Sequence, residues 1–167
     1  GAGSLVRWFS GRLAACRLEL HPEKTGIVYC ADANRRDDHR VRRFDFLGYT
    51  FKPRQAMNRK GRLFTSFSPA IGDRAGKAMR HQIRGWGLQR LSRYSLMELR
   101  ERFAPVVVGW VRYYGLFHAS RVQRALKTLD YHLVRWAQRK YKALRGHVSR
   151  AWDWLTALQR RAPTLFP

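Results

Sequence analysis

Asp32 and the pair Asp37–Asp38 come closer to a catalytic pattern than any other residues of this chain. Paired carboxylates hold the magnesium ions of phosphoryl-transfer sites. Here they lie among arginines and a histidine in a polar stretch, residues 32–43, that has no strand pattern. These surroundings indicate a solvated loop rather than a metal site, and we predict no metal ligand in the chain.

The side-chain patterns of other catalytic sites are missing from the sequence. Cys16 and Cys30 are isolated, and no two histidines have zinc-finger spacing, which argues against a zinc site and against a disulfide-rich secreted protein. No serine lies in a glycine elbow, and there is no glycine-rich phosphate loop. From residue types alone we predict no catalytic residue and no cofactor in this chain.

The charge balance is extreme and points to a polyanionic partner. The 167 residues include 34 lysines and arginines but 11 aspartates and glutamates, which gives a net charge of +23. Arginine supplies 27 of the cations, and its planar guanidinium suits bidentate contacts to phosphate. Apolar residues make up 45% of the chain, enough for a packed core, so a disordered basic tail is excluded. Nucleic acid is therefore the first partner to expect.

Cations recur at helical spacing in two places. The first stripe contains Lys77, Arg80, His81 and Arg84, and the second contains Arg124, Thr128, Tyr131, Arg135, Arg139 and Lys142. Either stripe could be an ordinary solvated helix face, but such faces usually interleave glutamates for i,i+4 pairing. Because acids are almost missing here, we predict that both stripes follow successive phosphates.

The hydropathy pattern argues against a membrane protein. The longest strictly apolar run covers about three residues, around Val106–Val108, far short of a membrane span. No secretory signal pattern opens the chain, and residues 1–4 are either native or a cloning remnant. We therefore expect a cytoplasmic protein.

The first 69 residues read as one helix followed by strands. Leu5, Phe9, Leu13 and Cys16 have helical spacing and predict a short amphipathic helix that closes near Arg17. The β-rich runs predict strands over residues 25–30, 44–51 and 63–67.

Beyond Pro69 the periodicity is helical throughout. We expect Asp73 to cap one helix and Ser95 and Glu98 to form the capping box of the next. Pro105 is expected to open an apolar helix that runs to Phe117. Ser120 is expected to open the longest helix, which Gly146 ends. A last helix is expected over residues 149–161, burying Trp152, Leu155 and Leu158. Trp110, Tyr113, Tyr114, Trp136 and Trp154 are also expected in the core, although Tyr113, beside Arg112, could reach the surface.

Six ordered blocks of sequence carry a resemblance to a known family. They are residues 18–25 (LELHPEKT), 44–54 (FDFLGYTFKPR), 67–71 (FSPAI), Gly109-Trp110 with Tyr113-Tyr114-Gly115, 139–142 (RKYK) and 163–166 (PTLF). In these blocks the chain strongly resembles group II intron-encoded reverse transcriptase/maturases.

The resemblance implies an α+β, mostly α fold, with a small β-hairpin remnant of the palm followed by a helical bundle. Residues 1–68 would be the C-terminal portion of the reverse transcriptase palm, and residues 69–167 the thumb and maturase-specific domain X. Lys24 would match the lysine of the palm's post-catalytic motif, near the incoming nucleotide, and residues 46–48 would match the primer-grip hairpin. In this family the intron RNA performs splicing, and the maturase stabilises the folded ribozyme.

The family's polymerase aspartates lie in a Tyr-x-Asp-Asp turn upstream of the LELHPEKT block, so neither Asp32 nor Asp37–Asp38 matches them. We therefore expect a fragment or truncated reading frame that does not polymerise alone, within or derived from a parent that uses Mg²⁺. The zinc-nuclease region that some relatives carry at the C-terminus is not expected either.

The sequence is thus interpreted as the RNA-binding thumb and maturase region of a group II intron-encoded protein in a bacterial or organellar ribonucleoprotein. It would grip intron RNA and the template–primer duplex and support splicing and reverse transcription by the parent. The residues predicted to bind nucleic acid are Lys24, Leu47, Gly48, Lys77, Arg80, Arg84, Arg112, Tyr113, Arg124, Arg135, Arg139, Lys140, Lys142 and Arg145. One alternative is part of an active RNA-directed DNA polymerase; another is a basic module that docks on an acidic protein or an anionic membrane.

Overall fold

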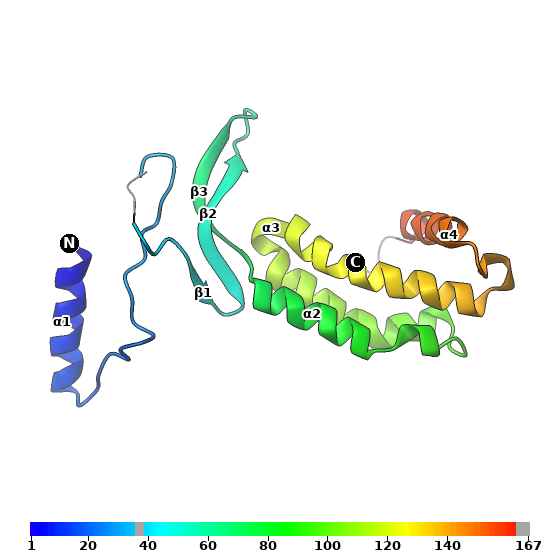
Figure 1. The fold of residues 1–167 in the computed structure, drawn as a ribbon, viewed down its shortest axis with the longest axis horizontal. Helices are drawn as coiled ribbons and strands as arrows, with labels where there is room; N and C mark the ends of the chain where they lie inside the picture. Colours follow the sequence, from blue (N-terminus) through cyan, green and yellow to red (C-terminus); the bar gives the residue numbers. More distant parts are fainter. Residues whose placement is uncertain (36–38, 163–167) are drawn as a thin grey trace. The chain divides into compact units, whose positions relative to one another are not determined.

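The computed structural model describes residues 1–35 and 39–162. Figure 1 shows a small sheet followed by helices, which confirms the α+β, mostly α fold class. The elements in chain order are α1 (Ala2–Ala15), β1 (Phe44–Phe46), β2 (Tyr49–Met57), β3 (Leu63–Ile71), α2 (Asp73–Gly85), the 3-10 turn η1 (Leu88–Arg90), α3 (Leu96–Lys140), the 3-10 turn η2 (Lys142–Leu144) and α4 (Val148–Arg161). The strands form one sheet in the order β1-β2-β3.

The chain forms two compact units. The first contains Gly1–Phe44 and Phe51–Ser68, and the second contains Asp45–Thr50 together with the residues from Pro69 onward. The turn between β1 and β2 therefore belongs to the same unit as the helical bundle. The assignment of residues 1–68 to a palm and of residues 69–167 to a thumb and domain X stays a prediction.

The first unit contains the first helix and most of the sheet. Helix α1 lies close to its predicted range, and none of its residues is buried. The ring of Phe44 stacks on that of Phe51, with centroids 4.6 Å apart and planes 1° from parallel. The predicted strand over residues 25–30 is wrong, because high β-propensity makes no strand without a neighbouring ladder. A backbone hydrogen bond from the N–H of Tyr29 to the carbonyl of Val41, 2.9 Å long, joins this segment to a later part of the chain.

The predicted strand over residues 44–51 is a hairpin. Leu47 and Gly48 separate β1 from β2, and their φ angles of 48° and 79° are both positive. Two central residues with positive φ make the tight turn whose twist matches the paired strands. Both longer strands also extend beyond the predicted ranges, β2 to Met57 and β3 to Ile71.

Helix α2 starts where β3 ends, and its cap differs from the prediction. Gly72, not Asp73, is the N-cap residue, and Asp73 lies in the first turn, where a carboxylate still complements the helix dipole. The N–H of Gly72 donates to the carbonyl of Gly48 at 2.8 Å. A Cβ at position 72 would lie 3.0 Å from that same oxygen, so this approach of two backbones requires glycine.

Helix α3 begins with the predicted capping box of Ser95 and Glu98. Its bonds include the Ser95 N–H donating to the carboxylate of Glu98 at 2.6 Å, and they hold the pKa of Glu98 below its ordinary value. The prediction that Pro105 opens a new helix is wrong, since the helix continues through this exposed proline. The break lies at His118, whose φ of −114° and ψ of 75° are not helical, close to the predicted start at Ser120.

The break at His118 divides α3 into a first arm, residues 96–117, and a second arm, residues 119–140. Figure 1 shows the second arm, in yellow and orange, returning alongside the first. The amine of Lys140 donates to the carbonyls of Ser92 and Tyr94 at 3.1 and 2.8 Å, so the end of the helix lies beside the segment that precedes its start. The bundle therefore contains a helical hairpin rather than one long rod.

The second arm ends at Lys140, six residues before the predicted end at Gly146. Tyr141 is extended, and its ring packs against those of Trp136 and Trp154, with centroids 5.9 and 5.6 Å away. Gly146 does have a positive φ, 76°, but it follows the short turn η2.

The bundle core lies between α2, both arms of α3 and α4. Trp136 is fully buried, as predicted, and its indole N–H donates to the carbonyl of Leu91 at 3.1 Å. The prediction for Trp152 is wrong: 37% of this side chain is exposed, because α4 turns Ala151 and Leu155 toward the core instead. The expectation that Tyr113 lies in the core is also wrong: 45% of this side chain is exposed, which agrees with the alternative that it reaches the surface.

Candidate nucleic-acid interface

The two predicted cationic stripes lie on neighbouring helices. Arg80 of α2 lines the same hollow as Arg121 and Arg124 of the second arm. Further along, Arg84 of α2 and Arg135 of the second arm both act on His132. The contacts advance in the same direction along both helices, so α2 and the second arm run parallel, side by side (Figure 1). We call these five arginines, 80, 84, 121, 124 and 135, the basic face.

The basic face has few acids to neutralise it. Between residues 119 and 142 the sequence contains one acid, Asp130, and between residues 74 and 85 it contains none. Asp130 accepts a bond from Gln159 of α4 at 3.0 Å, and burial raises the pKa of this carboxyl. Within the part of the chain that the structure describes, none of the five arginines forms an ion pair.

A histidine lies within the positive field of the basic face. Nδ1 of His132 lies 3.2 Å from Oε1 of Gln89, in the turn η1. Burial, followed by the nearby charges of Arg135 and Arg84, lowers the pKa of His132 below 6.5. At neutral pH this side chain is therefore an uncharged polar link between η1 and the second arm.

Two cations at the far end of the second arm are held in place by neighbouring groups. Nη1 of Arg135 donates to the hydroxyl of Tyr131 at 3.2 Å, and its guanidinium lies 5.6 Å from the centre of that ring. Nη1 of Arg139 donates to the carbonyl of Gln89 at 3.1 Å. Tyr131 is 49% exposed, so the Tyr131–Arg135 pair offers both a ring and a charge to a ligand.

The remaining predicted cations of the second unit lie in different settings. Lys77 is exposed on α2, and Arg112 is exposed on the first arm. Lys142 and Arg145 are also exposed, but they belong to η2 and the segment after it rather than to the second arm. Lys140 is half-buried and uses its amine on two backbone carbonyls, as described above, 5.7 Å from the centre of the Trp136 ring.

The hairpin residues Leu47 and Gly48 are fixed against the first arm of α3. The hydroxyl of Tyr113 donates to the carbonyl of Leu47 at 3.1 Å, and the hydroxyl of Tyr49 donates to the carbonyl of Tyr113. A Cβ on Gly48 would lie 2.5 Å from the hydroxyl oxygen of Tyr114. Two separate sequence blocks, FLGY and YYG, therefore meet in one contact.

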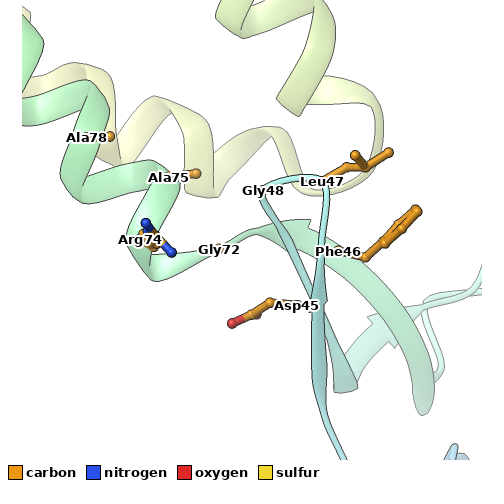
Figure 2. Close-up of a pocket in the computed structure, with 8 residues that line it drawn as sticks. All are labelled: Asp45, Phe46, Leu47, Gly48, Gly72, Arg74, Ala75 and Ala78. Atoms are coloured by element: carbon orange, nitrogen blue, oxygen red, sulfur yellow. The ribbon is translucent and has the colours of Figure 1, made fainter. Parts of the chain in front are cut away.

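A hollow of about 460 Å³ lies between this hairpin and the start of α2. Figure 2 shows Asp45 and Arg74 on one side of the hairpin and the side chains of Phe46 and Leu47 directed to the other. Phe46 and Leu47 are 59% and 66% exposed, respectively. The turn thus presents two apolar side chains to solvent on a backbone fixed to the helices.

The first unit contains one predicted site residue, Lys24, which is exposed in a turn where its N–H donates to the carbonyl of His21. The carboxylate of Asp32 accepts bonds from the N–H groups of Asn34 and Arg35 at 2.8 and 2.9 Å, so it shapes a local turn. Asp37–Asp38 and the block at residues 163–166 lie outside the described residues. Among the described residues, no group of three or more His, Cys, Asp or Glu side chains could hold a metal ion.

Four residues of this region were missed from the sequence. Arg121 was not assigned to the second stripe, because it lies between the predicted start of its helix at Ser120 and the first residue of that stripe, Arg124. Gln89 was unremarkable in a short turn. The contacts of Tyr49 and Gly72 depend on residues more than 20 positions away along the chain, and helical or strand periodicity contains no such information.

One of three comparisons with known proteins finds a similarity. Residues 76–152 match the sequence model of a family described as group II intron, maturase-specific domain. That range includes almost all of α2, all of α3 and the start of α4. No curated protein and no solved structure matches the chain significantly. None of the described helices is long and apolar enough to cross a membrane. Residues 76–152 of the bundle that carries the basic face are therefore similar to the group II intron maturase-specific domain.

Proposed function

We propose that this chain binds structured RNA through the basic face and, as the thumb and maturase region of an intron-encoded protein, supports splicing of a group II intron. The observation that carries the proposal is the convergence of five arginines, without an ion pair among the described residues, on one side of α2 and the second arm. Arginine forks suit phosphate oxygens, and a helical RNA presents rows of phosphates that a rigid cationic face can follow.

The hairpin extends the proposal to the template–primer duplex. Its turn is fixed to the first arm and exposes Phe46 and Leu47, as a grip on a nucleic-acid strand would require. The parent protein would supply the polymerase carboxylates and the Mg²⁺ that they hold. In this proposal the chain itself positions RNA and performs no chemical step.

The direct test is binding and splicing with a folded group II intron RNA. We expect the chain to bind this RNA and to lower the magnesium concentration at which the RNA splices, because a bound cationic face offsets phosphate repulsion in the folded state. The variant with Arg84, Arg124 and Arg135 all changed to Gln should lose this effect. The matched control changes three exposed arginines elsewhere, Arg102, Arg150 and Arg160, and should retain it. Equal loss in both variants would contradict the proposal.

Primer extension separates this function from the enzymatic alternative. The chain is incubated with a template–primer duplex, Mg²⁺ and deoxynucleotides, and we expect no extension. Incorporation of even one nucleotide that survives repurification of the protein would assign polymerase chemistry to this chain and would contradict a purely RNA-positioning role.

A further inference from the structure

Three arginines from two helices surround a small hollow at one end of the basic face. Arg80 comes from α2, and Arg121 and Arg124 come from the start of the second arm. The hollow has a volume of about 120 Å³ and is also lined by Gly72 and Gly76, which have no side chains. We call Arg80, Arg121 and Arg124 the arginine niche.

The charge of the arginine niche is uncompensated within the described protein. Asp73 also lines the hollow, but among the described residues neither it nor any of the three arginines forms an ion pair. One carboxylate facing three guanidinium groups leaves the hollow positive. The three guanidinium groups repel one another, and a bound anion would offset this repulsion. The hollow therefore favours an anionic ligand.

Gly76 lies against one of these guanidinium groups. It lies in the interior of α2, where glycine is less favourable than alanine, and it is buried. A Cβ at this position would lie 3.4 Å from Nη1 of Arg80, which is ordinary van der Waals contact with the end of a flexible side chain. Alanine therefore fits at position 76 without displacing the guanidinium of Arg80.

We propose that the arginine niche binds one internal backbone phosphate of the RNA and so fixes the register of the RNA on α2. This inference rests on the proposed function. Guanidinium forks can bind the oxygens of a single phosphate from several directions. Phosphate contacts of this kind position a nucleic acid without reading its bases. The RNA is favoured over a free anion because Arg84 and Arg135 lie further along the same two helices, where neighbouring phosphates would lie.

The test is phosphate-ethylation interference with a folded group II intron RNA, combined with affinity measurements. Arg121→Gln should weaken binding by about fivefold to tenfold, the loss expected for one charge-assisted contact. It should also abolish the interference at one linkage and leave the other linkages unchanged. The matched control, Arg150→Gln on α4, should leave both the affinity and the interference pattern unchanged.

Two further variants change the hollow without removing an arginine. Asp73→Asn removes the opposing carboxylate and should tighten binding by about twofold to threefold. Gly76→Ala should raise the melting temperature, because alanine favours the helix, and should leave the affinity and the interference pattern unchanged, because its Cβ fits beside Arg80. Gly76→Ala therefore shows whether a change in stability alone alters RNA binding.

Each outcome decides a different question. If wild-type protein binds no RNA, the proposed function fails and the niche assignment fails with it. If wild-type protein binds RNA but Arg121→Gln behaves like Arg150→Gln, the niche assignment alone is wrong. If inorganic phosphate stabilises wild-type protein but not Arg121→Gln, while the interference patterns of the two are identical, the hollow binds a free anion and the proposal is overturned.

Discussion

The hydroxyl of Tyr49, on β2, donates a hydrogen bond to the backbone carbonyl of Tyr113, on the first arm of α3. The hydroxyl of Tyr113 in turn donates to the carbonyl of Leu47, so the hairpin and the helix are joined in both directions. Burial, and secondarily the neighbouring Tyr113 and Tyr114, raises the pKa of Tyr49 above 10.0. The pair couples the exposed turn to the helical bundle.

Removal of either hydroxyl should destabilise the second unit. We expect Tyr113→Phe to cost about 1 kcal/mol, the usual net value of one hydrogen bond, and Tyr49→Phe to cost up to about 2 kcal/mol because its acceptor is less accessible to water. Urea unfolding measures both. Tyr141→Phe is the matched control, since no hydrogen bond of the Tyr141 hydroxyl is present among the described residues, and it should change the unfolding free energy by less than about 0.5 kcal/mol. Equal losses in all three would contradict the proposed coupling.

Gly48 should be the least replaceable residue of the hairpin. Its positive φ disfavours any side chain, and a Cβ would also lie 2.5 Å from the Tyr114 hydroxyl. We expect Gly48→Ala to cost about 3 kcal/mol, the sum of backbone strain and overpacking.

Gly61 provides the control for backbone strain alone. Its φ is 75°, but nothing lies within 4 Å of its virtual Cβ. Gly61→Ala should therefore cost about 1 kcal/mol. Similar losses at positions 48 and 61 would mean that the hairpin does not dock on the first arm.

Leu47 has a strained backbone conformation and an exposed apolar side chain, and neither feature stabilises the fold. Its φ is 48°, which is costly for a branched apolar residue, and 66% of the side chain is in contact with solvent. Leu47→Asn should raise the unfolding free energy by about 0.5–1 kcal/mol, because asparagine tolerates this conformation, and it should weaken binding of a template–primer duplex. A variant that binds the duplex as tightly as wild type would contradict a role for Leu47 in gripping it.

Local signals predicted the helices well and the contacts poorly. The capping box at Ser95 and Glu98 was predictable because both partners lie within four residues, and the break near His118 followed from the start signal at Ser120. Pro105 misled the prediction, since packing of the first arm outweighs the one hydrogen bond that a proline removes. The convergence of the stripes could not be predicted, because it depends on the parallel packing of α2 and the second arm. The register of the FLGY and YYG blocks likewise depends on tertiary structure.

His132 gives the stability a measurable dependence on pH. Because its pKa in the folded state lies below 6.5, the unfolded state binds more protons just below that pH. Stability should therefore be greatest above pH 6.5 and should fall as the pH drops through the lowered pKa. His132→Gln should flatten this decline in urea unfolding between about pH 8 and about pH 5.

Asp130 should produce the opposite slope when the urea unfolding is extended below about pH 5. Burial raises its pKa above 3.8, so the folded state binds more protons over the window just above that value, and stability falls there as pH rises. Asp130→Asn removes this contribution to the pH dependence of stability. If His132→Gln and Asp130→Asn changed the slope in the same direction, the environments assigned to these two residues would be wrong.

The salt dependence of RNA binding tests the central claim most directly. For a folded group II intron RNA, log K should fall with log salt by roughly 0.7 to 0.9 per phosphate contacted, so the variant of Arg84, Arg124 and Arg135 should have a slope shallower by about two to three than wild type. The control variant of Arg102, Arg150 and Arg160 removes the same charge and should keep the wild-type slope. Identical slopes in the two triple variants would show that the net charge of the chain, rather than the basic face, holds the RNA, and would contradict this account.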